Sequence, residues 1–162
     1  MTEVIPFSPG HEAGVVSVVL PIQQLEFGIA ITLEDQPDLL SIPDVYQKGA
    51  GNFWVALSAG EVVGTVGLID IGHGQVALRK MFVRASFRGR DRGVAAGLLQ
   101  AVADWADQRR LKDVFLGTTS KYLAAHRFYE KNSFSEIRAE DLPEAFPRMA
   151  VDTKFYWRAF SR

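Results

Sequence analysis

The sequence predicts an α+β fold in which a mixed, mostly antiparallel sheet of about six to seven strands is flanked by helices. Residues 52–83 hold alternating apolar runs joined by short turns, which is typical of an antiparallel meander. From residue 94 the apolar spacing changes to the helical period, and a short β-branched and aromatic run follows at 113–119. A strand, a helix and a strand in that order favour parallel pairing, so we expect both kinds of pairing in one sheet.

Length and composition predict a single globular domain over residues 1–162. Of the 162 residues, 48% are hydrophobic and 23% are charged, and one hydrophobic core is usual for a chain of this size. No run reaches the ~18 apolar residues that span a bilayer, and residues 1–14 lack the basic and then apolar pattern of a leader. We therefore expect a cytoplasmic protein that does not bind a membrane.

The residue inventory argues against several kinds of site. The chain has no cysteine, which excludes disulfides, thiolate zinc sites and cysteine nucleophiles. Its three histidines, His11, His73 and His126, lack the spacing of a helical metal site, so we expect no metal. The net charge of −1 argues against a protein that binds nucleic acid by overall attraction.

The N-terminal third is predicted to hold one strand and two helical segments. Residues 3–7 suit a short strand, and Ser8 followed by Pro9 is typical of a helix start. A helix is then expected over residues 10–24, although Pro21 lies within it. Residues 33–52 predict a broken second helix that enters a glycine-rich loop.

The middle of the chain is predicted to form three strands of a meander. The runs at 52–58 and 61–70 form a hairpin, because only Ala59 and Gly60 separate them. The Gly-His-Gly turn at 72–74 leads to the third strand at 75–83.

The C-terminal half is predicted to alternate helices and strands. A helix begins at residue 94, a strand occupies 113–119, and a second helix follows at 121–134 with Leu123, Ala124 and Phe128 on its inner face. The last strands are expected at 134–138 and 153–159. Two prolines make residues 142–149 a loop.

The stretch RGRDRGVAAGLL, from Arg88 to Leu99, is a candidate anion site. A helix N-terminus presents unpaired amides and partial positive charge, and Gly89 and Gly93 let a ligand approach them. Six basic residues and one acidic residue lie between Arg79 and Arg92, and guanidinium groups suit phosphate. A pyrophosphate would fit, whereas solvated surface charge is the alternative. The stretch matches neither the nucleoside-triphosphate P-loop nor the three-glycine dinucleotide motif.

Four segments together resemble the core of the GNAT family of acyl-CoA-dependent N-acetyltransferases: LRKMFV, RGRDRGVAAGLL, FLGTT and AAHRFYEKNSF. The family's Arg/Gln-x-x-Gly-x-Gly/Ala loop is matched by Arg90 to Ala95. Its helical Ala-x-x-Phe-Tyr with a following Phe is matched by Ala125, Phe128, Tyr129 and Phe134. The resemblance covers about residues 50–138 and implies the GNAT fold, in which the strand that ends at Val83 and the strand that starts at Val114 splay apart at the acetyl-CoA site.

The resemblance also implies roles for named residues. Tyr129 would protonate the departing thiolate, and the main chain of the strand would pair with the pantetheine arm and polarise the thioester carbonyl. The residues implied in coenzyme binding are Met81, Phe82, Val83, Arg88, Gly89, Arg90, Asp91, Arg92, Gly93, Val94, Ala95 and Lys131. The alternatives are a packed aromatic at Tyr129 and a solvated lysine at Lys131.

Three positions depart from the family pattern. The spacing from Val83 to Gly93 is about two residues longer than usual, so Arg88 and Arg90 compete for the first position of the loop motif. Tyr122 stands where the family usually has Asn, and Ser133 where it prefers Gly.

The acceptor side is predicted less sharply. The segment 25–39 holds Glu26, Glu34, Asp35 and Asp38 without a basic residue, which would suit a cationic amine, and Phe27 could line its pocket. Glu26 and Phe27 are therefore the candidate substrate-binding residues. The aromatic tail at 154–160 would form the opposite wall or a contact in a homodimer.

The group that removes the amine's proton stays open. Candidates are Glu26, Glu34, Glu61 and Asp70, or a water relayed by Thr118 or Thr119.

The predicted function is transfer of an acetyl group from acetyl-CoA to a primary amine, of a small molecule or a peptide, by direct attack. The alternative is a non-catalytic acyl-CoA-binding or sensor protein on the same scaffold. We expect no metal cofactor and no nucleic-acid partner.

Overall fold

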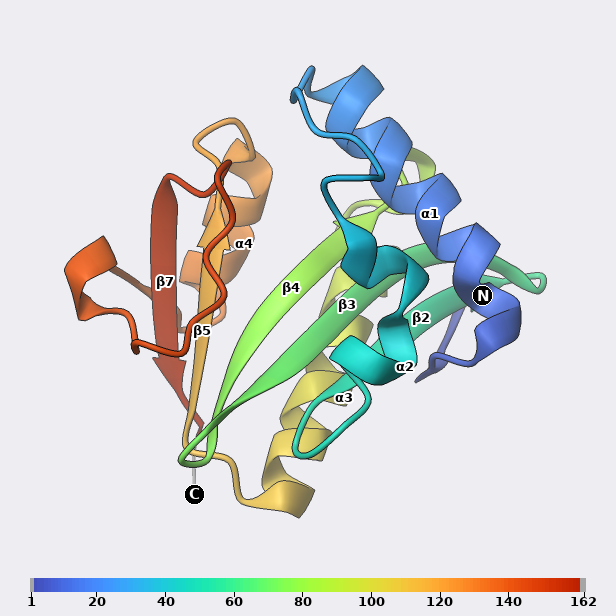
Figure 1. The fold of residues 1–162 in the computed structure, drawn as a ribbon. Coiled ribbons are helices and arrows are strands. Elements are labelled where there is room, and N and C mark those ends of the chain that lie inside the picture. Colours follow the sequence, from blue (N-terminus) through green and yellow to red (C-terminus); the bar gives the residue numbers. More distant parts are fainter. Residues whose placement is uncertain (1, 161–162) are drawn as a thin grey trace.

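The computed structural model describes residues 2–160 and contains one seven-stranded sheet (Figure 1). The strand order is β1-β2-β3-β4-β5-β7-β6. The strands are β1 (Thr2–Pro6), β2 (Asn52–Ser58), β3 (Glu61–Gly72), β4 (Gln75–Val83), β5 (Asp113–Thr118), β6 (Ser135–Ile137) and β7 (Lys154–Ala159). All neighbours pair antiparallel except β4 and β5, which are parallel. The predicted mixed α+β sheet is confirmed.

Four helices cover the sheet, namely α1 (Glu12–Pro21), α2 (Ile42–Val45), α3 (Val94–Arg109) and α4 (Leu123–Lys131). Short 3-10 turns are η1 (Pro9–His11), η3 (Pro37–Leu40), η4 (Ala85–Phe87) and η5 (Ala139–Asp141), and η2 (Ile22–Glu26) is a π-helical turn. Among the described helices, none is long and apolar enough to cross a bilayer.

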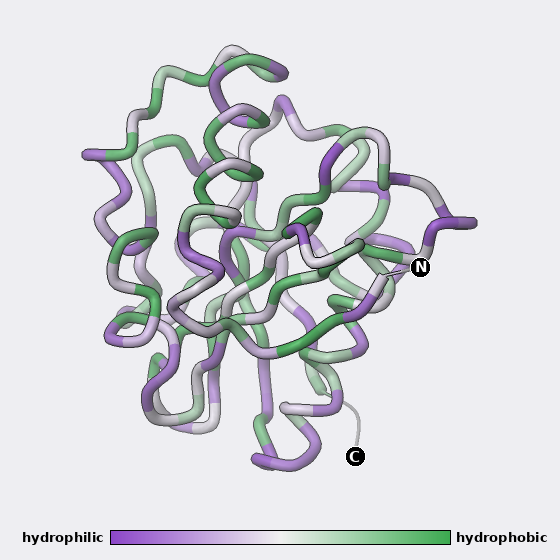
Figure 2. Tube along the Cα trace, turned by 90° about the vertical axis from the view of Figure 1, so that its right-hand side faces the viewer, coloured by the Kyte–Doolittle hydropathy of each residue, from purple (hydrophilic) through white to green (hydrophobic). Residues whose placement is uncertain are grey.

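The helices pack on both faces of the sheet. In Figure 1, α1 and α2 lie in front of β2 to β4, while α3 lies behind them. The core behind the sheet combines α3 residues such as Leu98 and Val102 with Leu68 and Leu78 of the strands. The core in front is formed by α1, α2 and the other side of β2 and β3. Hydrophilic residues gather at the peripheral loops (Figure 2).

The first helix follows the sequence prediction with one change. Ser8 is the N-cap of η1 and Pro9 occupies its first position. Pro21 ends α1, and the chain continues as the π-helical turn η2. A proline has no N–H to donate to the preceding turn, which explains why the regular hydrogen-bond pattern stops there. This turn carries Gln23 and Glu26 toward the functional region.

The expected inner face of α4 is only partly right, because Phe128 packs against the core whereas the other two predicted residues do not. Leu123 is 61% exposed and Ala124 is also exposed, whereas His126 and Tyr129 are the buried residues of this helix. The His126 ring pairs with the Thr119 carbonyl oxygen at 2.9 Å. A helix of nine residues has few apolar positions, so one shift of the inner face changes which residues are buried.

The strands β4 and β5 separate partway along their length. Their pairing runs from Gln75 with Asp113 to Leu78 with Leu116, and β4 then continues to Val83 without a partner on that side. Figure 1 shows the two strands diverging from that point. The splay implied by the resemblance is therefore present.

A β-bulge interrupts β4 just beyond the last pair. Thr65 pairs with Phe82 and Gly67 with Arg79, so Lys80 and Met81 stand opposite a single residue of β3. Lys80 has a φ of 56°, and its carbonyl oxygen accepts a hydrogen bond from the Thr65 hydroxyl at 2.6 Å. Bulges re-aim side chains, and this one lets Arg79 and Lys80 line the same cavity.

Candidate active site

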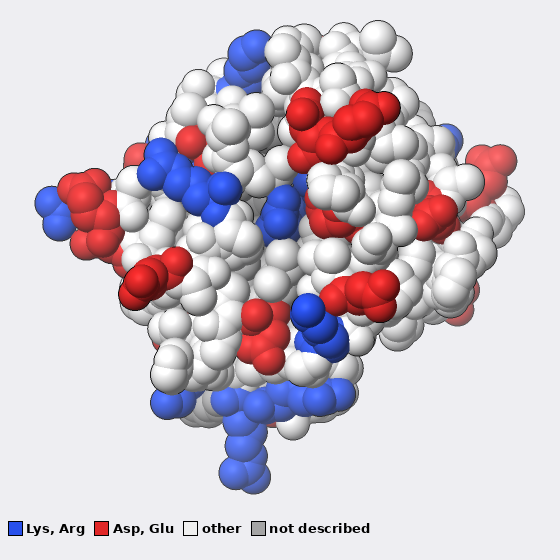
Figure 3. Space-filling view, viewed as in Figure 1, with Lys and Arg blue, Asp and Glu red and all other residues white. Residues whose placement is uncertain are grey.

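A cavity of about 660 Å³ opens where β4 and β5 diverge. Its walls come from β4, β5, α4, the start of α3, the turn η2 and the loop at 146–152. Figure 3 shows this face of the molecule, with basic side chains at the margin of a hollow near its centre and inside it. Segments distant in the sequence thus meet around one concave site, the usual form of a ligand pocket.

The start of α3 forms one end of the cavity. Gly89 has a φ of 112° and Gly93, the N-cap, has a φ of 69°, which are conformations that favour glycine. The first helical hydrogen bond runs from the Gly97 N–H to the Gly93 carbonyl at 2.9 Å. The preceding amides of residues 94–96 therefore have no backbone acceptor. No atom lies within 4 Å of a Cβ built on Gly93, so the chain is open to a ligand on that side of the helix start.

Arg88 lines the cavity but is already engaged. Its Nη1 and Nη2 donate to the two carboxylate oxygens of Glu26 at 2.5 and 2.8 Å, and its Nε donates to the Val83 carbonyl at 2.8 Å. The hydrogen bond from Arg88 lowers the pKa of the Glu26 carboxyl. Glu26 itself does not line the cavity. The pair instead joins η2 to the loop before α3.

The other loop residues separate into two groups. Gly89, Arg90, Gly93 and Ala95 line the cavity. Arg92 lies outside it, with its guanidinium 5.2 Å from the Phe87 ring centroid. Asp91 and Val94 also lie outside, and the Val94 side chain is buried in the core behind the sheet. Among the described residues, Arg90 is therefore the loop arginine that lines the cavity and has no ion pair.

The free edge of β4 forms the middle of the cavity. Met81, Phe82 and Val83 all line it, and the described chain places no strand against them on the β5 side. Unpaired main-chain groups on a strand edge can hydrogen-bond an extended ligand.

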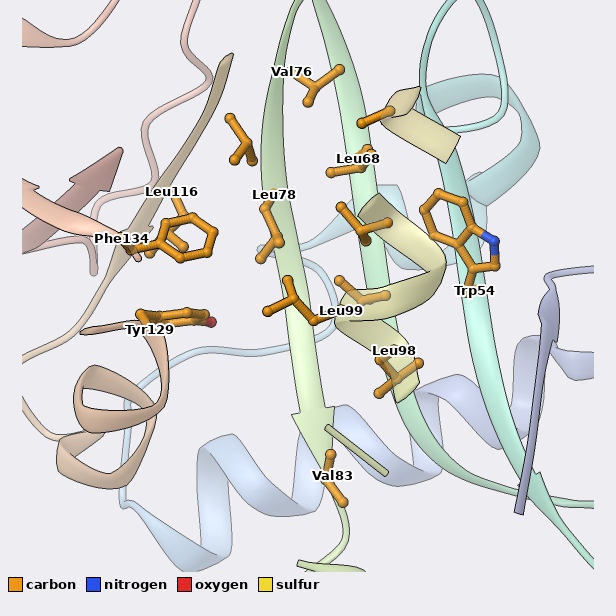
Figure 4. Close-up of a cluster of buried hydrophobic side chains, with 14 of the residues drawn as sticks. Trp54, Leu68, Val76, Leu78, Val83, Leu98, Leu99, Leu116, Tyr129 and Phe134 are labelled. Carbon is orange, nitrogen blue, oxygen red and sulfur yellow. The ribbon is translucent and has the colours of Figure 1, made fainter. Parts of the chain in front are cut away.

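Tyr129 reaches the cavity from α4. Its ring lies among Phe134 and Tyr156, with centroid separations of 5.4 and 5.9 Å, and Figure 4 shows its hydroxyl directed toward β4. Burial raises the pKa of the Tyr129 phenol above its usual range. No hydrogen-bond partner for this hydroxyl is found among residues 2–160, although the residue lines the cavity. The ring is held in place while the hydroxyl is free to meet a ligand.

Tyr122, the departure from the family's Asn, packs into the same wall. Its ring contacts Phe27 and Phe82 edge to face, with centroid separations of 4.8 and 5.9 Å. All three residues line the cavity. This cluster joins η2, β4 and α4, and it places the predicted residue Phe27 at the wall. Lys131, at the end of α4, is exposed and lines the same side.

Lys80 is a site residue that the sequence analysis did not identify. Its Nζ donates to the Gln36 amide oxygen at 2.7 Å and lies 3.6 Å from Asp38 Oδ2. Burial lowers the pKa of the Lys80 ammonium to about 8, against the attraction of Asp38. Arg79 lines the cavity beside it. The available signal was a pair of basic residues inside an otherwise apolar strand.

The loop before β7 closes the far end of the cavity. Asp152 lines the cavity and accepts the Met149 N–H at 2.9 Å through Oδ2. Burial raises the pKa of the Asp152 carboxyl. A Cβ on Gly117 of β5 would lie 2.7 Å from this carboxylate oxygen, so glycine is what lets the loop approach.

Two groups of residues expected on the acceptor side lie outside the cavity. The aromatic tail does not line the cavity, because Phe155 and Tyr156 are buried in the cores of the sheet and Trp157 donates to Asp113. The acidic residues of segment 25–39 do not line it either. Asp35 accepts hydrogen bonds from Thr32, and Asp38 is held by buried groups.

Among the described residues, no group of three or more His, Asp or Glu is arranged to hold a metal ion.

Comparison with known proteins points to one family. Residues 19–134 match the model of the acetyltransferase (GNAT) family. A Staphylococcus aureus acetyltransferase of the GNAT family has a crystal structure that superposes with a TM-score of 0.95 at 34% identity, covering 99% of this chain and 100% of that one. An acetyltransferase from Thermoplasma acidophilum, solved in complex with coenzyme A, shares the fold with a TM-score of 0.72 at 12% identity, covering 99% of each chain.

Curated relatives match this chain over only part of their own length. N-acetylaspartate synthetase of Xenopus tropicalis is 35% identical over 102 residues, which are 62% of this chain and 37% of that protein. The chain thus spans little more than a third of that relative. Family model, fold and cavity nevertheless coincide, and the chain belongs to the acetyltransferase (GNAT) family.

Proposed function

We propose that the protein transfers an acetyl group from acetyl-CoA to an amine. The observation that carries this proposal is the meeting, in one cavity, of a free strand edge, a helix N-terminus with open amides and a tyrosine hydroxyl without a partner. The helix N-terminus suits the pyrophosphate of an acyl-CoA, the strand edge suits its pantetheine arm, and the tyrosine hydroxyl suits its sulfur. The fold relative solved with coenzyme A supports the ligand class.

The start of α3 suits the pyrophosphate of coenzyme A. Residues 94–96 offer amides to the phosphate oxygens, and the helix adds partial positive charge. Gly93 leaves the approach open, while Arg90 supplies a counter-charge from within the cavity. Lys131 lines the cavity from α4, where it can meet a further phosphate.

The edge of β4 suits the pantetheine arm. An amide-containing chain laid along residues 81–83 can pair with the main chain as an added strand. A β4 N–H pointing into the gap can also donate to the thioester carbonyl, where negative charge develops during attack.

Tyr129 suits protonation of the departing thiolate. Its raised pKa keeps the phenol protonated at neutral pH, so it is a proton donor and not a base. Its hydroxyl faces β4 across the gap where the thioester would lie (Figure 4). The aromatic neighbours fix the ring, which keeps the donor in position.

The predicted base candidates differ in their positions. Glu26, Glu34, Glu61 and Asp70 do not line the cavity, and Asp70 accepts the amides of Ala50 and Gly72. Thr118 and Thr119 do line it, as does Asp152. Proton removal by Asp152, or by water held at the two threonines, is therefore the proposed route.

The test combines binding with turnover. Calorimetry should show that coenzyme A binds to the wild-type protein, and a panel of amines mixed with acetyl-CoA should release free thiol. The protein has no cysteine to interfere with thiol detection. Binding without turnover on any amine would favour the acyl-CoA sensor, and absence of binding would contradict the proposed function.

A further inference from the structure

Two consecutive basic residues stand at the apex of the gap, away from the start of α3. Arg79 follows Leu78, the last residue of β4 that pairs with β5, and Lys80 forms the bulge. Both line the cavity. Figure 3 shows a basic group within the hollow at the centre of this face. The coenzyme's phosphates at the other end would not need these two cations.

The charge of Lys80 is balanced inside the protein. Asp38 lies 3.6 Å from its Nζ and also accepts the Tyr46 hydroxyl at 2.6 Å. Gln36 accepts from Lys80 at 2.7 Å, and its amide exchanges hydrogen bonds with Gln23 at 3.0 and 2.8 Å. This buried network is complete without a ligand.

Arg79 differs from Lys80 because it has no such partner. It is half-buried, and residues 2–160 provide its guanidinium with no ion pair and no hydrogen bond. It lines the same cavity as Lys80 and Asp152, and its charge opposes the rise that burial causes in the pKa of the Asp152 carboxyl. A guanidinium presents five donors, and leaving them unpaired away from water is costly. The group is suited to a planar anion that arrives with a ligand.

The opposite wall supplies one carboxylate. Asp152 is the acidic residue that lines the cavity in the described chain, and only its Oδ2 has a hydrogen-bond donor, the Met149 N–H. It lies against Gly117 on the β5 side, whereas Arg79 lies on β4. A cation and a carboxylate thus sit on either side of the place where β4 and β5 diverge.

We propose that the acceptor is an amino carboxylate, such as a free amino acid, whose carboxylate is bound by Arg79. The proposal rests on the proposed function, since it names the substrate class of the same site. A bidentate guanidinium–carboxylate pair satisfies Arg79 and is among the strongest polar contacts in proteins. Asp152 then faces the amino end of the ligand. Segment 25–39 led us to expect a cationic amine. The proposal replaces this with a ligand that carries both an ammonium group and a carboxylate.

The reaction balances with these groups. The amine nitrogen forms a bond to the acetyl carbon, the carbon–sulfur bond breaks, and the thiolate takes a proton from Tyr129. The ammonium gives up one proton to Asp152 or water before the nitrogen attacks. The nitrogen gives up a second proton as the tetrahedral intermediate collapses, and this proton, carried by water, replaces the one that Tyr129 gave to the thiolate. Arg79 holds the carboxylate throughout and exchanges no proton, because its guanidinium stays charged.

The first experiment compares matched acceptors. The common amino acids and their α-carboxamides are assayed with acetyl-CoA by thiol release, together with polyamines and arylalkylamines that lack a carboxylate. Aspartate with asparagine and glutamate with glutamine extend the comparison to side-chain carboxylates. We expect kcat/KM for the best amino acid to exceed that of its matched amide by about tenfold or more, as for loss of a hydrogen bond to a charged group.

The second experiment changes the arginine. Arg79→Gln should lower kcat/KM for the carboxylate acceptor by about tenfold or more, leave that for the amide nearly unchanged, and leave coenzyme A affinity unchanged. Arg79→Lys should restore part of the discrimination. Arg109→Gln is the matched control, because it removes the same charge from a guanidinium stacked 4.0 Å from the Trp105 ring centroid on α3, outside the cavity.

The outcomes separate the two proposals. The inference is overturned if amines without a carboxylate have an equal or higher kcat/KM. It is also overturned if Arg79→Gln lowers kcat/KM equally for the carboxylate acceptor and its amide. In both cases the proposed function stands. If coenzyme A binds but no amine is acetylated, the proposed function fails. Calorimetric titration of amino acids into the coenzyme-saturated protein then decides the inference alone, with binding that depends on Arg79 supporting it and absence of binding overturning it.

Discussion

The two ends of the cavity are built by different means. At the start of α3 the site consists of main-chain amides, glycines in left-handed conformations and two cavity-lining arginines, Arg88 and Arg90, all within residues 88–96. At the apex of the gap it consists of side chains from β4, η2, η3 and the loop before β7. A main-chain site is encoded by one short motif, whereas a side-chain site depends on tertiary contacts. This contrast predicts that mutations at the two ends affect different ligands.

Tyr129 lies between the two ends and should show the largest effect. Tyr129→Phe keeps the ring contacts with Phe134 and Tyr156 but removes the proton donor. Turnover should fall by about 10²- to 10⁴-fold, the usual contribution of general acid catalysis, whereas coenzyme A affinity should stay within error. Steady-state kinetics with calorimetry measure both. Unchanged turnover would show that the thiolate leaves without this proton.

The coenzyme end is tested by two matched charge reversals. Arg90→Glu should weaken coenzyme A binding by about tenfold, because it places a carboxylate beside the phosphates, and added salt should reduce the difference. Arg92→Glu changes the net charge equally, but Arg92 lies on Phe87 outside the cavity. Equal weakening by both variants, measured by calorimetry, would contradict a local phosphate site.

The acceptor end is tested through the pH dependence of stability. The folded-state pKa of Lys80, about 8, lies below its usual value of 10.5, so the unfolded chain binds more protons between these values. Stability should therefore rise with pH in this window, by about 1 kcal/mol from pH 8 to pH 9. Urea titrations of wild type and Lys80→Met at both pH values measure the difference. An identical pH dependence in the two proteins would show that Lys80 titrates normally.

The link between the two ends should have the smallest effect. Glu26→Gln breaks the ion pair with Arg88, whose side chains are 34% and 36% exposed. The free energy of unfolding should fall by at most about 1 kcal/mol, as for other solvent-accessible pairs. Because the Glu26 pKa is lowered, wild type should lose this contribution as pH falls through that value, while Glu26→Gln should not. Thermal denaturation at neutral and acidic pH compares them.

Much of the fold was predictable because each element carries its own local signal. The hairpin through Ala59 and Gly60, the parallel strand at β5 and the helix start at Gly93 follow from turn residues and apolar period. The inner face of α4 was not predictable, because it depends on how a short helix meets the sheet. The π-helical turn after Pro21 likewise needed the structure.

The site, like the fold, was predictable only where neighbouring residues carry the signal. The loop motif and Tyr129 are contiguous patterns, and the structure brings both into one cavity. The partnership of Arg88 with Glu26, which are 62 residues apart in sequence, has no local signal. The same holds for Lys80 with Gln36 and Asp38, because a bulge decides where that side chain points.

The short pairing between β4 and β5 divides the sheet into two wedges, one formed by β1 to β4 and the other by β5, β7 and β6. Four residue pairs, from Gln75 with Asp113 to Leu78 with Leu116, form the pairing of these strands in the described chain. An acyl-CoA that lies along the remaining edge would act as an eighth strand between the wedges. The cosubstrate would then be a structural member of the sheet, and its departure after each turnover would loosen the framework that held it.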